Sequence, residues 1–512
     1  MALPSTHQAS MLRIRSWASD TETPVSLFAR LSANASTAFL LDSTEGDSRL
    51  ARFSIIGVNP SQIFKVKHGV ASLISYADHR EQHYSWACLD PLAWLAEQMA
   101  MQTPHVEARK KALAAAMPLP WEGSLPFTGG WAGVTGYGAT QYSDHIDMQA
   151  NDPLGLPDLC YGRYDEVIVI DHRLRRTFWL CDLPQDEADK RWDCLQRVLN
   201  APHPAPLTPL PLDYFQDKLS RPDWIFQNVE GPFDKMSFCQ AIQQAKAWIG
   251  EGQIFQLVVA QRFSLPVSQN VDSAFYLTLY RVLQAINPTP YGYFLKFPDA
   301  SYVGSSPETF VTCTDNRVKL RALAGTRYRG KSQAEDDALA SELVQHPKEL
   351  AEHRMLVDLD RNDLGRVCET GSIYTGAIAQ LTRYTHVMHL TTDIEGHLRK
   401  DKTPLDLFKA CLPRGTVSGA PKIRAMQLLS QLEPEQRGWY SGVVGYFGKE
   451  GNMDGAIAIR SAVLQPGWVH VHAGAGVVFD AVPEHEYLET RNKAKSTLAA
   501  AQIALALSTA LA

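Results

Sequence analysis

Residues 469–483 read Val-His-Val-His-Ala-Gly-Ala-Gly-Val-Val-Phe-Asp-Ala-Val-Pro, and this stretch decides the fold class. Its first five residues predict a β-strand. Pro483 suits the first position of a helix, and a helical pattern of apolar residues continues from it to residue 507. A strand that leads into a long helix indicates a mixed α/β fold.

Strand-like and helix-like segments alternate on both sides of a proline-rich segment at 201–211. Because its prolines disfavour helix and interior strand, we expect this segment to be an extended connector on the surface. After it, strand-like runs cover 254–263, 291–297, 456–464 and 469–473, and helical patterns cover 233–251, 340–366, 404–411, 420–433 and 483–507. Before it, residues 39–41, 53–56 and 166–171 are strand-like, with a glycine-rich bend at 129–138. We therefore predict a β-rich region over 1–200, a connector over 201–225 and a second region over 226–512.

The composition of the 512 residues is typical of a globular protein, with 45 % hydrophobic and 20 % charged residues. The formal net charge is −6 and no run of five like charges occurs, so we expect no nucleic-acid or membrane-surface binding. The eight cysteines form no CxxC pair and no secretory leader is evident, which favours reduced thiols and a cytoplasmic location. The apolar segment 496–512 is shorter than the ~20 residues that span a bilayer, and it predicts a terminal packing helix.

Three polar side chains of the last predicted helix fall on one face. Glu486, Glu489 and Lys493 stand at positions i, i+3 and i+7. A fourth, Glu352, interrupts the apolar stripe of an earlier helix that begins at Pro347. These residues form either solvated, ion-paired helix faces or an oxygen-only site that suits Mg²⁺, in which Glu352 meets the row across a cleft. Sequence spacing does not decide between the two.

Two segments could bind a ligand through small or hydroxylated residues. Gly474-Ala-Gly476 lets backbone N–H groups approach a carboxylate closely, or it forms a tight strand-to-helix turn. Thr416 and Ser418 precede a helix that Pro421 can begin, so the alternative to a ligand contact is helix capping. Neither segment matches a dinucleotide fingerprint or a phosphate loop, and we expect no nucleotide binding.

Three single residues are candidates for binding and proton transfer. Arg460 follows the apolar residues 456–459, so we expect its charge to be buried beside an anion. That anion is either an internal carboxylate or a bound ligand. His389 is either a core histidine or an imidazole in a cleft that exchanges protons near neutral pH. Glu308 follows Ser-Ser-Pro, where proline would present the carboxylate from a rigid turn or the acid would simply begin a helix.

Five motifs that include these candidates follow one another along the chain. They are Gly304-Ser-Ser-Pro-Glu308, Leu323-Ala-Gly-Thr-Arg327, Glu352-His-Arg-Met-Leu-Val-Asp-Leu-Asp-Arg-Asn-Asp363, Gly415-Thr-Val-Ser-Gly-Ala-Pro-Lys422 and Gly474-Ala-Gly476. The ordered set resembles the chorismate-utilising enzymes, specifically the large subunit of anthranilate synthase. The resemblance covers nearly the whole chain. It implies a large composite α/β (α+β) fold of stacked antiparallel sheets flanked by helices, with chorismate and Mg²⁺ bound in the region 226–512.

The resemblance also implies roles for individual residues. Glu352 and Glu489 look like the Mg²⁺ ligands, with Glu486 beside them. The expected chorismate contacts are Gly325, Thr326, Tyr440, Arg460, Gly474, Ala475, Gly476 and Lys493. Because chorismate carries two carboxylates, the metal, the two cationic side chains and backbone amides would supply the positive potential that an acidic chain lacks.

The implied lyase reaction adds ammonia at C2 of chorismate with loss of the C4 hydroxyl, and then eliminates pyruvate to leave anthranilate. Glu308 matches the family's acid, which protonates the leaving hydroxyl. His389 matches the base that removes the proton at C2, and Thr416 is placed in the same catalytic set. Both proton transfers therefore have a candidate residue.

Three positions separate relatives within the family. Ala324 stands where aminodeoxychorismate synthases typically carry lysine, and Thr-Val-Ser at 416–418 stands where they typically read Ser-Ile-Thr. Gln256 occupies the place of the lysine that activates water in isochorismate and salicylate synthases, so ammonia is the better nucleophile here. An aminodeoxychorismate synthase and a synthase that stops at aminodeoxyisochorismate are the alternatives, and the presence of His389 disfavours the second.

The N-terminal region resembles the regulatory part of the family. Leu40-Leu-Asp-Ser43 matches the family's tryptophan segment Leu-Leu-Glu-Ser with aspartate in place of glutamate, which makes Leu41 and Ser43 effector contacts. Pro290, Tyr291 and Gly292 would form the other wall of the effector site. The resemblance thus implies feedback inhibition by tryptophan, through a less active arrangement that tryptophan prefers.

A partner subunit is also expected. The chain contains no Gly-x-Cys-x-Gly-like nucleophile segment, so a separate glutamine amidotransferase, anthranilate synthase component II, would supply the ammonia, and the family suggests a heterotetramer. A catalytically silent, tryptophan-binding regulatory protein is the alternative from another class of function. The presence of Glu352, Glu489 and His389 argues against it.

Overall fold

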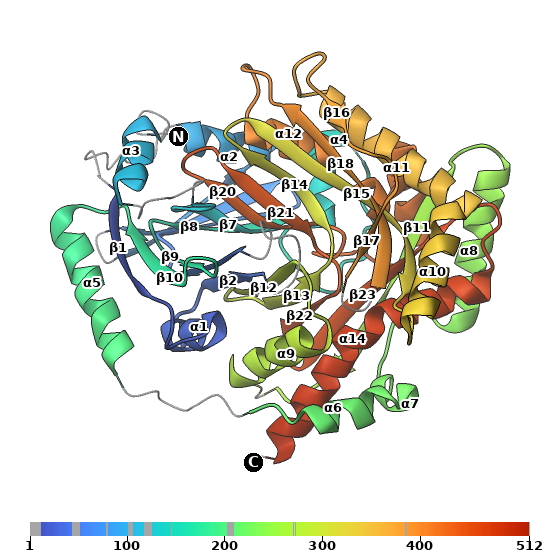
Figure 1. The fold of residues 1–512 in the computed structure, drawn as a ribbon, viewed down its shortest axis with the longest axis horizontal. Coiled ribbons are helices and arrows are strands. Elements are labelled where there is room, and N and C mark those ends of the chain that lie inside the picture. The colour runs from blue at the N-terminus through green and yellow to red at the C-terminus, as the bar shows by residue number, and fades with distance from the viewer. Residues whose placement is uncertain are drawn as a thin grey trace.

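The computed structural model describes residues 12–43, 52–77, 80–100, 106–116, 125–144, 146–201, 209–269, 271, 273–384 and 387–510. Within these residues, two large antiparallel sheets of 11 and 12 strands stack on each other (Figure 1). Helices pack on the outer face of each sheet. This arrangement confirms the predicted α/β (α+β) fold of stacked antiparallel sheets flanked by helices.

The first sheet takes strands from both sides of the proline-rich connector. In spatial order it contains β1 (Arg13–Ala18), β10 (Arg176–Cys181), β9 (Glu166–Asp171), β3 (Phe53–Val58), β2 (Ala38–Asp42), β12 (Tyr291–Lys296), β13 (Ser301–Ser306), β22 (Ser461–Gln465), β23 (Trp468–Val477), β11 (Gln256–Pro266) and β19 (Gly419–Ala420). The two parts of the sequence join where β2 pairs with β12, with Asp42 opposite Gly292.

The second sheet is built in the same way. Its order is β16 (Tyr374–Thr375), β18 (Val387–His397), β15 (Arg317–Tyr328), β14 (Thr309–Thr314), β21 (Met453–Ile457), β20 (Val443–Gly448), β7 (Gly130–Thr135), β8 (Leu159–Tyr164), β4 (Gln62–Lys67), β5 (Val70–Ala77) and β6 (Arg80–Ala87), and β17 (Gln380–Arg383) also pairs with β18. Here the join is between β20 and β7. The predicted regions 1–200 and 226–512 therefore share both sheets.

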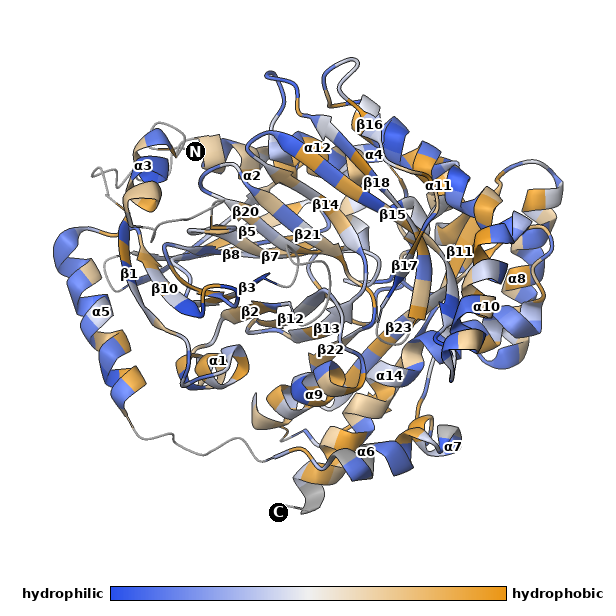
Figure 2. Cartoon of the chain, viewed as in Figure 1, coloured by the Kyte–Doolittle hydropathy of each residue, from blue (hydrophilic) through white to orange (hydrophobic). Residues whose placement is uncertain are grey.

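The helices lie around the sheets. They are α1 (Pro24–Ser32), α2 (Pro91–Ala100), α3 (Val106–Ala116), α4 (Gln141–Asp144), α5 (Gln185–Asn200), α6 (Leu212–Leu219), α7 (Pro222–Ile225), α8 (Lys235–Gly250), α9 (Ser273–Ile286), α10 (Gln333–Gln345), α11 (Pro347–Gly365), α12 (Pro404–Cys411), α13 (Lys422–Leu432) and α14 (Pro483–Ala510), with 3₁₀ turns η3 (Tyr137–Thr140) and η4 (Gly415–Val417). Helix α5 is mostly hydrophilic in Figure 2, and of its side chains Ala188 and Leu195 are buried.

Alternation along the strands explains why the sheets stack. Leu40 and Ile56 face outward and pack with α1, α9 and α14. Their neighbours Phe39 and Ile55 face the other way and pack against Val134 of the second sheet. Because successive side chains of a strand point to opposite faces, strands that are apolar on both faces need cover on both. Helices α2, α11 and α12 cover the outer face of the second sheet.

Helix α14, the last described helix, packs against strands β23 and β11 of the first sheet. It begins at Pro483, as predicted, and its buried alanines and leucines pack against α9 and β23. This confirms the predicted terminal packing helix. Among the described residues, no helix combines the length and hydrophobicity needed to cross a membrane.

Local structure differs from the sequence prediction at four places. The helix predicted over 340–366 is two helices, because His346, which ends α10 and caps α11, precedes a proline that disfavours helical backbone. The strand predicted over 456–464 is broken at Arg460, which has a left-handed φ of 53°. Residues 129–138 hold strand β7 rather than a bend. Of the connector over 201–225, residues 202–208 lie outside the described part, and α6 and α7 lie in the remainder.

Candidate active site

Small residues in β23 make room for two polar side chains. Gly474, Ala475 and Gly476 lie within the strand and pair with β11, so the alternative of a tight turn is wrong. A Cβ on Gly474 would lie 2.9 Å from the Tyr440 hydroxyl, and one on Gly476 would lie 3.1 Å from Nε2 of Gln256. Gly474 therefore leaves room for the Tyr440 hydroxyl, and a side chain at position 476 would require Gln256 to shift slightly.

Lys493 and Arg460 form the cationic part of the site. The ammonium of Lys493 donates to the Gly474 carbonyl at 2.9 Å and pairs with Oε1 of Glu489 at 2.6 Å. Nη1 of Arg460 donates to the backbone carbonyl of Lys493 at 2.6 Å. Among the described residues Arg460 forms no ion pair, and burial lowers the pKa of its guanidinium. The internal-carboxylate alternative is therefore not supported, and Arg460 is available to a bound anion.

His389 is held by a β-bulge in the neighbouring strand. Strand β15 pairs with β18 with an irregularity between Ala324 and Thr326, where Gly325 has a φ of 70°. The bulge brings the Gly325 carbonyl to 3.1 Å and the Thr326 hydroxyl to 3.0 Å from Nδ1 of His389. Because a carbonyl only accepts, Nδ1 carries the proton and Nε2 of the neutral ring is the basic nitrogen. Burial lowers the pKa of His389, which keeps the ring neutral and able to accept a proton.

Glu308 follows β13 and is buried, with a side chain that the rigid Ser-Ser-Pro segment directs inward. Its Oε1 has no hydrogen-bond partner, and neither has the hydroxyl of nearby Thr416. Burial raises the pKa of Glu308, while Arg414, Thr416 and Lys493 lower it. Helix α13 has no side-chain cap, so the capping alternative for Thr416 and Ser418 is wrong. A buried acid with a raised pKa and an unpaired oxygen is suited to donate a proton to a ligand.

The carboxylates of α11 and α14 approach each other across the site. Burial raises the pKa of Glu352, and the charges of Glu349 and Glu489 raise it further. Burial and the neighbouring Glu489 also raise the pKa of Glu486 to about 7. Glu352 and Glu489 therefore lie within electrostatic reach of each other, although they belong to different helices.

These residues fit a cation, although they are not gathered as a closed metal cage. Oε2 of Glu486 is buried without a hydrogen-bond partner, and the acids repel one another. A divalent cation would bind the unpaired oxygen and reduce the repulsion between the acids. Among the described residues, no group of three His, Cys, Asp or Glu side chains stands close enough to hold a metal ion. Mg²⁺ commonly binds through one or two carboxylates together with waters and an anionic substrate, which is compatible with this open arrangement.

Comparison with known proteins identifies the family of this chain. A family model described as chorismate binding enzyme matches residues 36–499. The chain belongs to the chorismate-binding enzymes. The chain is similar to anthranilate synthase component 1 of Thermus thermophilus, with 37 % identity over 493 residues that cover 96 % of this chain and 97 % of the relative. It is similarly 37 % identical to the Pseudomonas putida protein of that name over 491 residues, with 95 % and 94 % covered.

Solved structures agree with the fold of this chorismate-binding enzyme. Anthranilate synthase component I from Streptococcus pneumoniae matches with a TM-score of 0.71 and 34 % identity, over 89 % of this chain and 93 % of that chain. MenF, the menaquinone-specific isochorismate synthase from Escherichia coli, matches with a TM-score of 0.68 and 18 % identity, over 96 % and 95 % of the two chains. The second match shows the shared fold alone.

The predicted effector residues of this chorismate-binding enzyme come together at the join of β2 and β12. Leu41 pairs with Tyr293, and the Ser43 hydroxyl donates to the Pro290 carbonyl at 2.7 Å. The Tyr291 hydroxyl reaches Asp454 at 3.2 Å and the Thr309 hydroxyl at 3.1 Å. Since Thr309 follows Glu308 directly, hydrogen bonds link the predicted effector wall to the residue beside the acid.

Sequence reasoning missed one charged group beside Glu308. Arg414 precedes η4, and its guanidinium pairs with Asp360 of α11. Asp363 pairs with Lys422 at 2.6 Å one turn along the helix. The sequence signal is the charged run Asp-Leu-Asp-Arg-Asn-Asp at 358–363, because acidic residues are seldom fully buried unless they are paired.

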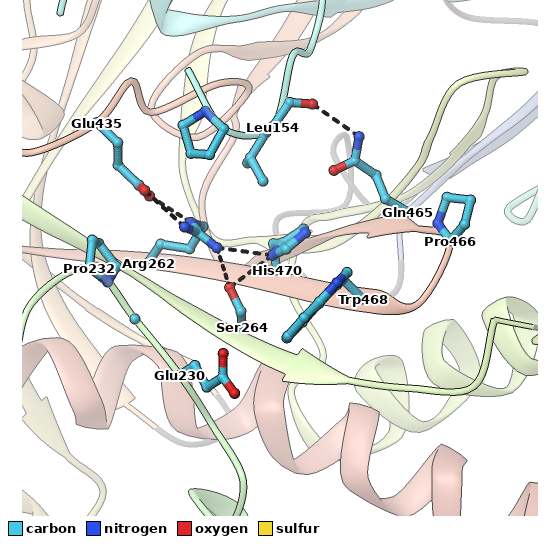
Figure 3. A pocket seen from close by; sticks show the side chains of 12 residues that line it. Leu154, Glu230, Pro232, Arg262, Ser264, Glu435, Gln465, Pro466, Trp468 and His470 are labelled. Atoms are coloured by element: carbon cyan, nitrogen blue, oxygen red, sulfur yellow. Dashed lines mark hydrogen bonds and ion pairs between the residues drawn. The ribbon is translucent and has the colours of Figure 1, made fainter. Parts of the chain in front are cut away.

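A pocket of about 630 Å³ lies elsewhere, at the β22–β23 hairpin, and contains none of the predicted site residues (Figure 3). Its Arg262 is bound through two atoms to Glu435, at 2.5 and 2.8 Å. The ring of Trp468 stacks on His470 with centroids 6.0 Å apart. Because the arginine is already neutralised, this pocket offers no free positive charge to a dicarboxylate.

Proposed function

We propose that this chain converts chorismate and ammonia to anthranilate and pyruvate in an Mg²⁺-dependent reaction, the first step of tryptophan biosynthesis. The observation that carries the proposal is the arrangement around Lys493. This residue contacts Gly474, Glu489 and, through its backbone, Arg460, and its charge acts on Glu308. Lys493 is therefore linked to the anion site, to the acidic cluster and, through its charge, to the proton donor. The relatives named anthranilate synthase component 1 support the same activity.

Substrate binding uses the cationic side chains and the small strand. Arg460, which has no internal counter-ion among the described residues, binds one carboxylate of chorismate, and Lys493 adds positive potential beside it. Gly325, Thr326 and Tyr440 complete the contacts, and the small residues 474–476 let the ring approach the backbone. Glu352 and Glu489, with Glu486 beside them, would hold Mg²⁺, which when bound polarises and orients the ring carboxylate.

The first chemical step needs an acid. Ammonia forms a bond to C2, the ring double bonds shift, and the C4–O bond breaks. Because hydroxide is a poor leaving group, Glu308 donates its proton to the departing oxygen, which leaves as water. The burial that raises the pKa of Glu308 favours the protonated form that this step needs, and the Thr416 hydroxyl lies near the carboxyl group.

The second step needs a base. Nε2 of His389 takes the proton from C2, its electron pair completes the aromatic ring, and the C3–O bond breaks to release pyruvate. The Gly325 carbonyl fixes the tautomer that has Nε2 free of a proton. Residues of two paired strands therefore set the basic nitrogen for this step.

Three finer properties belong to the same proposal. Ammonia comes from a glutamine amidotransferase subunit in a cytoplasmic heterotetramer, in keeping with the component 1 names of the relatives. Tryptophan inhibits the enzyme by binding where Ser43 meets Pro290. The hydrogen bonds from Tyr291 to Asp454 and Thr309 support a route from this site to Glu308.

The test uses the purified chain with chorismate, Mg²⁺ and ammonium at alkaline pH, where free ammonia is abundant. Anthranilate fluorescence and pyruvate are followed with and without tryptophan. We expect equimolar anthranilate and pyruvate, suppressed by tryptophan. Chorismate consumed without pyruvate would instead indicate a synthase that stops at an aminodeoxychorismate-type product. No consumption would favour the silent regulatory protein.

A further inference from the structure

Beside Glu308 lies a buried ion pair that the reaction described above does not use. Nη2 of Arg414 donates to Oδ2 of Asp360 at 3.0 Å, and Nη1 donates to the Phe310 carbonyl at 3.2 Å. The two side chains are 1 % and 4 % exposed. The cost of removing such a pair from water commonly offsets the attraction between its charges. An apolar pair of similar size would therefore stabilise the core about equally well. Its position beside the proton donor therefore calls for a chemical explanation.

Arg414 and Glu308 each have a buried polar atom without a hydrogen-bond partner. Nε of Arg414 and Oε1 of Glu308 are both buried without a hydrogen bond. In the described part of the chain no ion pair joins the two side chains, although the charge of Arg414 acts on Glu308. A buried donor and a neighbouring buried acceptor that do not bond are uncommon. The hydrogen bonds of the Arg414 guanidinium go instead to Asp360 and to the Phe310 carbonyl.

We propose that Asp360 is a positioning residue, which anchors Arg414 so that the guanidinium does not pair with Glu308 and the Glu308 carboxyl keeps its proton. The identity of the group that receives this proton rests on the proposed function. Without the anchor, Arg414 turns to Glu308 and forms a direct ion pair. An ionised carboxylate held in that pair has no proton to donate.

The charged groups that face Glu308 come from three elements. Arg414, before η4, and Lys493 of α14 favour the carboxylate, whereas Asp360 of α11 opposes them. Burial raises the pKa of Asp360 to about 7, so this residue is charged above neutral pH. Loss of the Asp360 charge leaves Arg414 without its ion-pair partner, which favours the ionised form of Glu308.

The experiment is an infrared titration of the full-length chain. The carbonyl band of the protonated Glu308 carboxyl is assigned by its absence in Glu308→Gln. In Asp360→Asn, which keeps the side-chain shape, we expect the midpoint of this band to fall by about one pH unit. In Arg414→Gln it should rise by about one unit, because the cation is gone. Asp358→Asn, an exposed acid of the same helix, is the matched control and should leave the midpoint unchanged.

The double variant Asp360→Asn/Arg414→Gln tests whether Asp360 acts through Arg414. If it does, the midpoint of the double variant equals that of Arg414→Gln alone. A role confined to packing would lower the melting temperature in all three variants without shifts of opposite sign. Should Asp360→Asn fail to fold, Arg414→Gln and the double variant carry the test, and an unraised midpoint in both overturns the proposal.

A second readout separates this inference from the proposed function. The rate of ammonia-dependent anthranilate formation is measured across pH as the ratio of variant to wild type, which cancels the ionisation of ammonia. The ratio for Asp360→Asn should fall as pH rises, and Arg414→Lys should restore more of the wild-type profile than Arg414→Gln. Midpoints that shift as expected in a chain that makes no anthranilate would refute the proposed function alone. Anthranilate formed without any shift of the midpoints would refute the role of Asp360.

Discussion

Arg460 offers the sharpest test of how the site binds its substrate. The side chain has one described hydrogen bond, from Nη1 to the Lys493 carbonyl, and no counter-ion among the described residues. A hydrogen bond between a guanidinium and a carboxylate contributes about 1.5–3 kcal/mol. Arg460→Gln removes this charge and keeps a polar side chain of similar length, so the dissociation constant of chorismate should rise about 10- to 150-fold at about 1.4 kcal/mol per factor of ten.

The assay is calorimetric titration of chorismate with Mg²⁺ but without ammonia, so that no turnover occurs. The melting temperature should change little, because Arg460 forms no ion pair among the described residues. Arg197→Gln, an exposed arginine of α5, is the control and should bind chorismate like the wild type. A dissociation constant for Arg460→Gln within twofold of the wild-type value, in a folded variant, would refute the assignment of Arg460 as the carboxylate contact.

Four further outcomes are expected. Glu489→Gln should abolish Mg²⁺-dependent turnover, measured as the rate against metal concentration. Glu484→Gln, at an exposed position of the same helix, should leave turnover intact, and wild-type activity in Glu489→Gln would remove Glu489 from the metal site. His389→Ala should slow pyruvate release more than amination, so an aminated intermediate accumulates on chromatography, and an equal loss in both steps would contradict its role as base. Ser43→Leu should blunt inhibition by tryptophan because it removes the bond to Pro290, and an unchanged inhibition curve would place the effector elsewhere. Burial lowers the pKa of His470 to about 4, so the unfolded chain binds this proton more readily than the folded chain. His470 should therefore lower stability by about 1 kcal/mol per unit as pH drops from about 6.5 to 4, and His470→Gln should remove that contribution in denaturant unfolding; an unchanged pH dependence would contradict it.

Helix ends and strand alternation explain what the sequence could predict. Pro347 and Pro483 stand at the starts of α11 and α14, where proline is tolerated, so the register of the carboxylates on those helices followed from sequence. The motif order placed Glu308, His389 and Arg460 in one region, and the structure brings each beside a group that influences it. Their roles stay predictions until the variants are measured.

What escaped prediction depends on long-range packing. The buried face of α11 includes the polar residues His353, Asp360 and Asp363, which no hydrophobic period reveals. Asp360 is buried because Arg414, more than fifty residues later, lies against it, and a single sequence does not show that pairing. The break at Arg460 was also missed, since a non-glycine residue with positive φ is held there by surrounding contacts rather than by its own preference.

The pairing of β2 with β12 has a consequence for how the protein folds during its synthesis. Asp42 leaves the ribosome about 250 residues before its partner Gly292, a delay of roughly 12 to 50 s at the usual rate of synthesis. During that time one side of β2 exposes unpaired N–H and C=O groups, a template for wrong strand pairing. The nascent chain therefore depends on slow, non-local closure of its sheets, and chaperones that shield strand edges should increase the yield of folded enzyme.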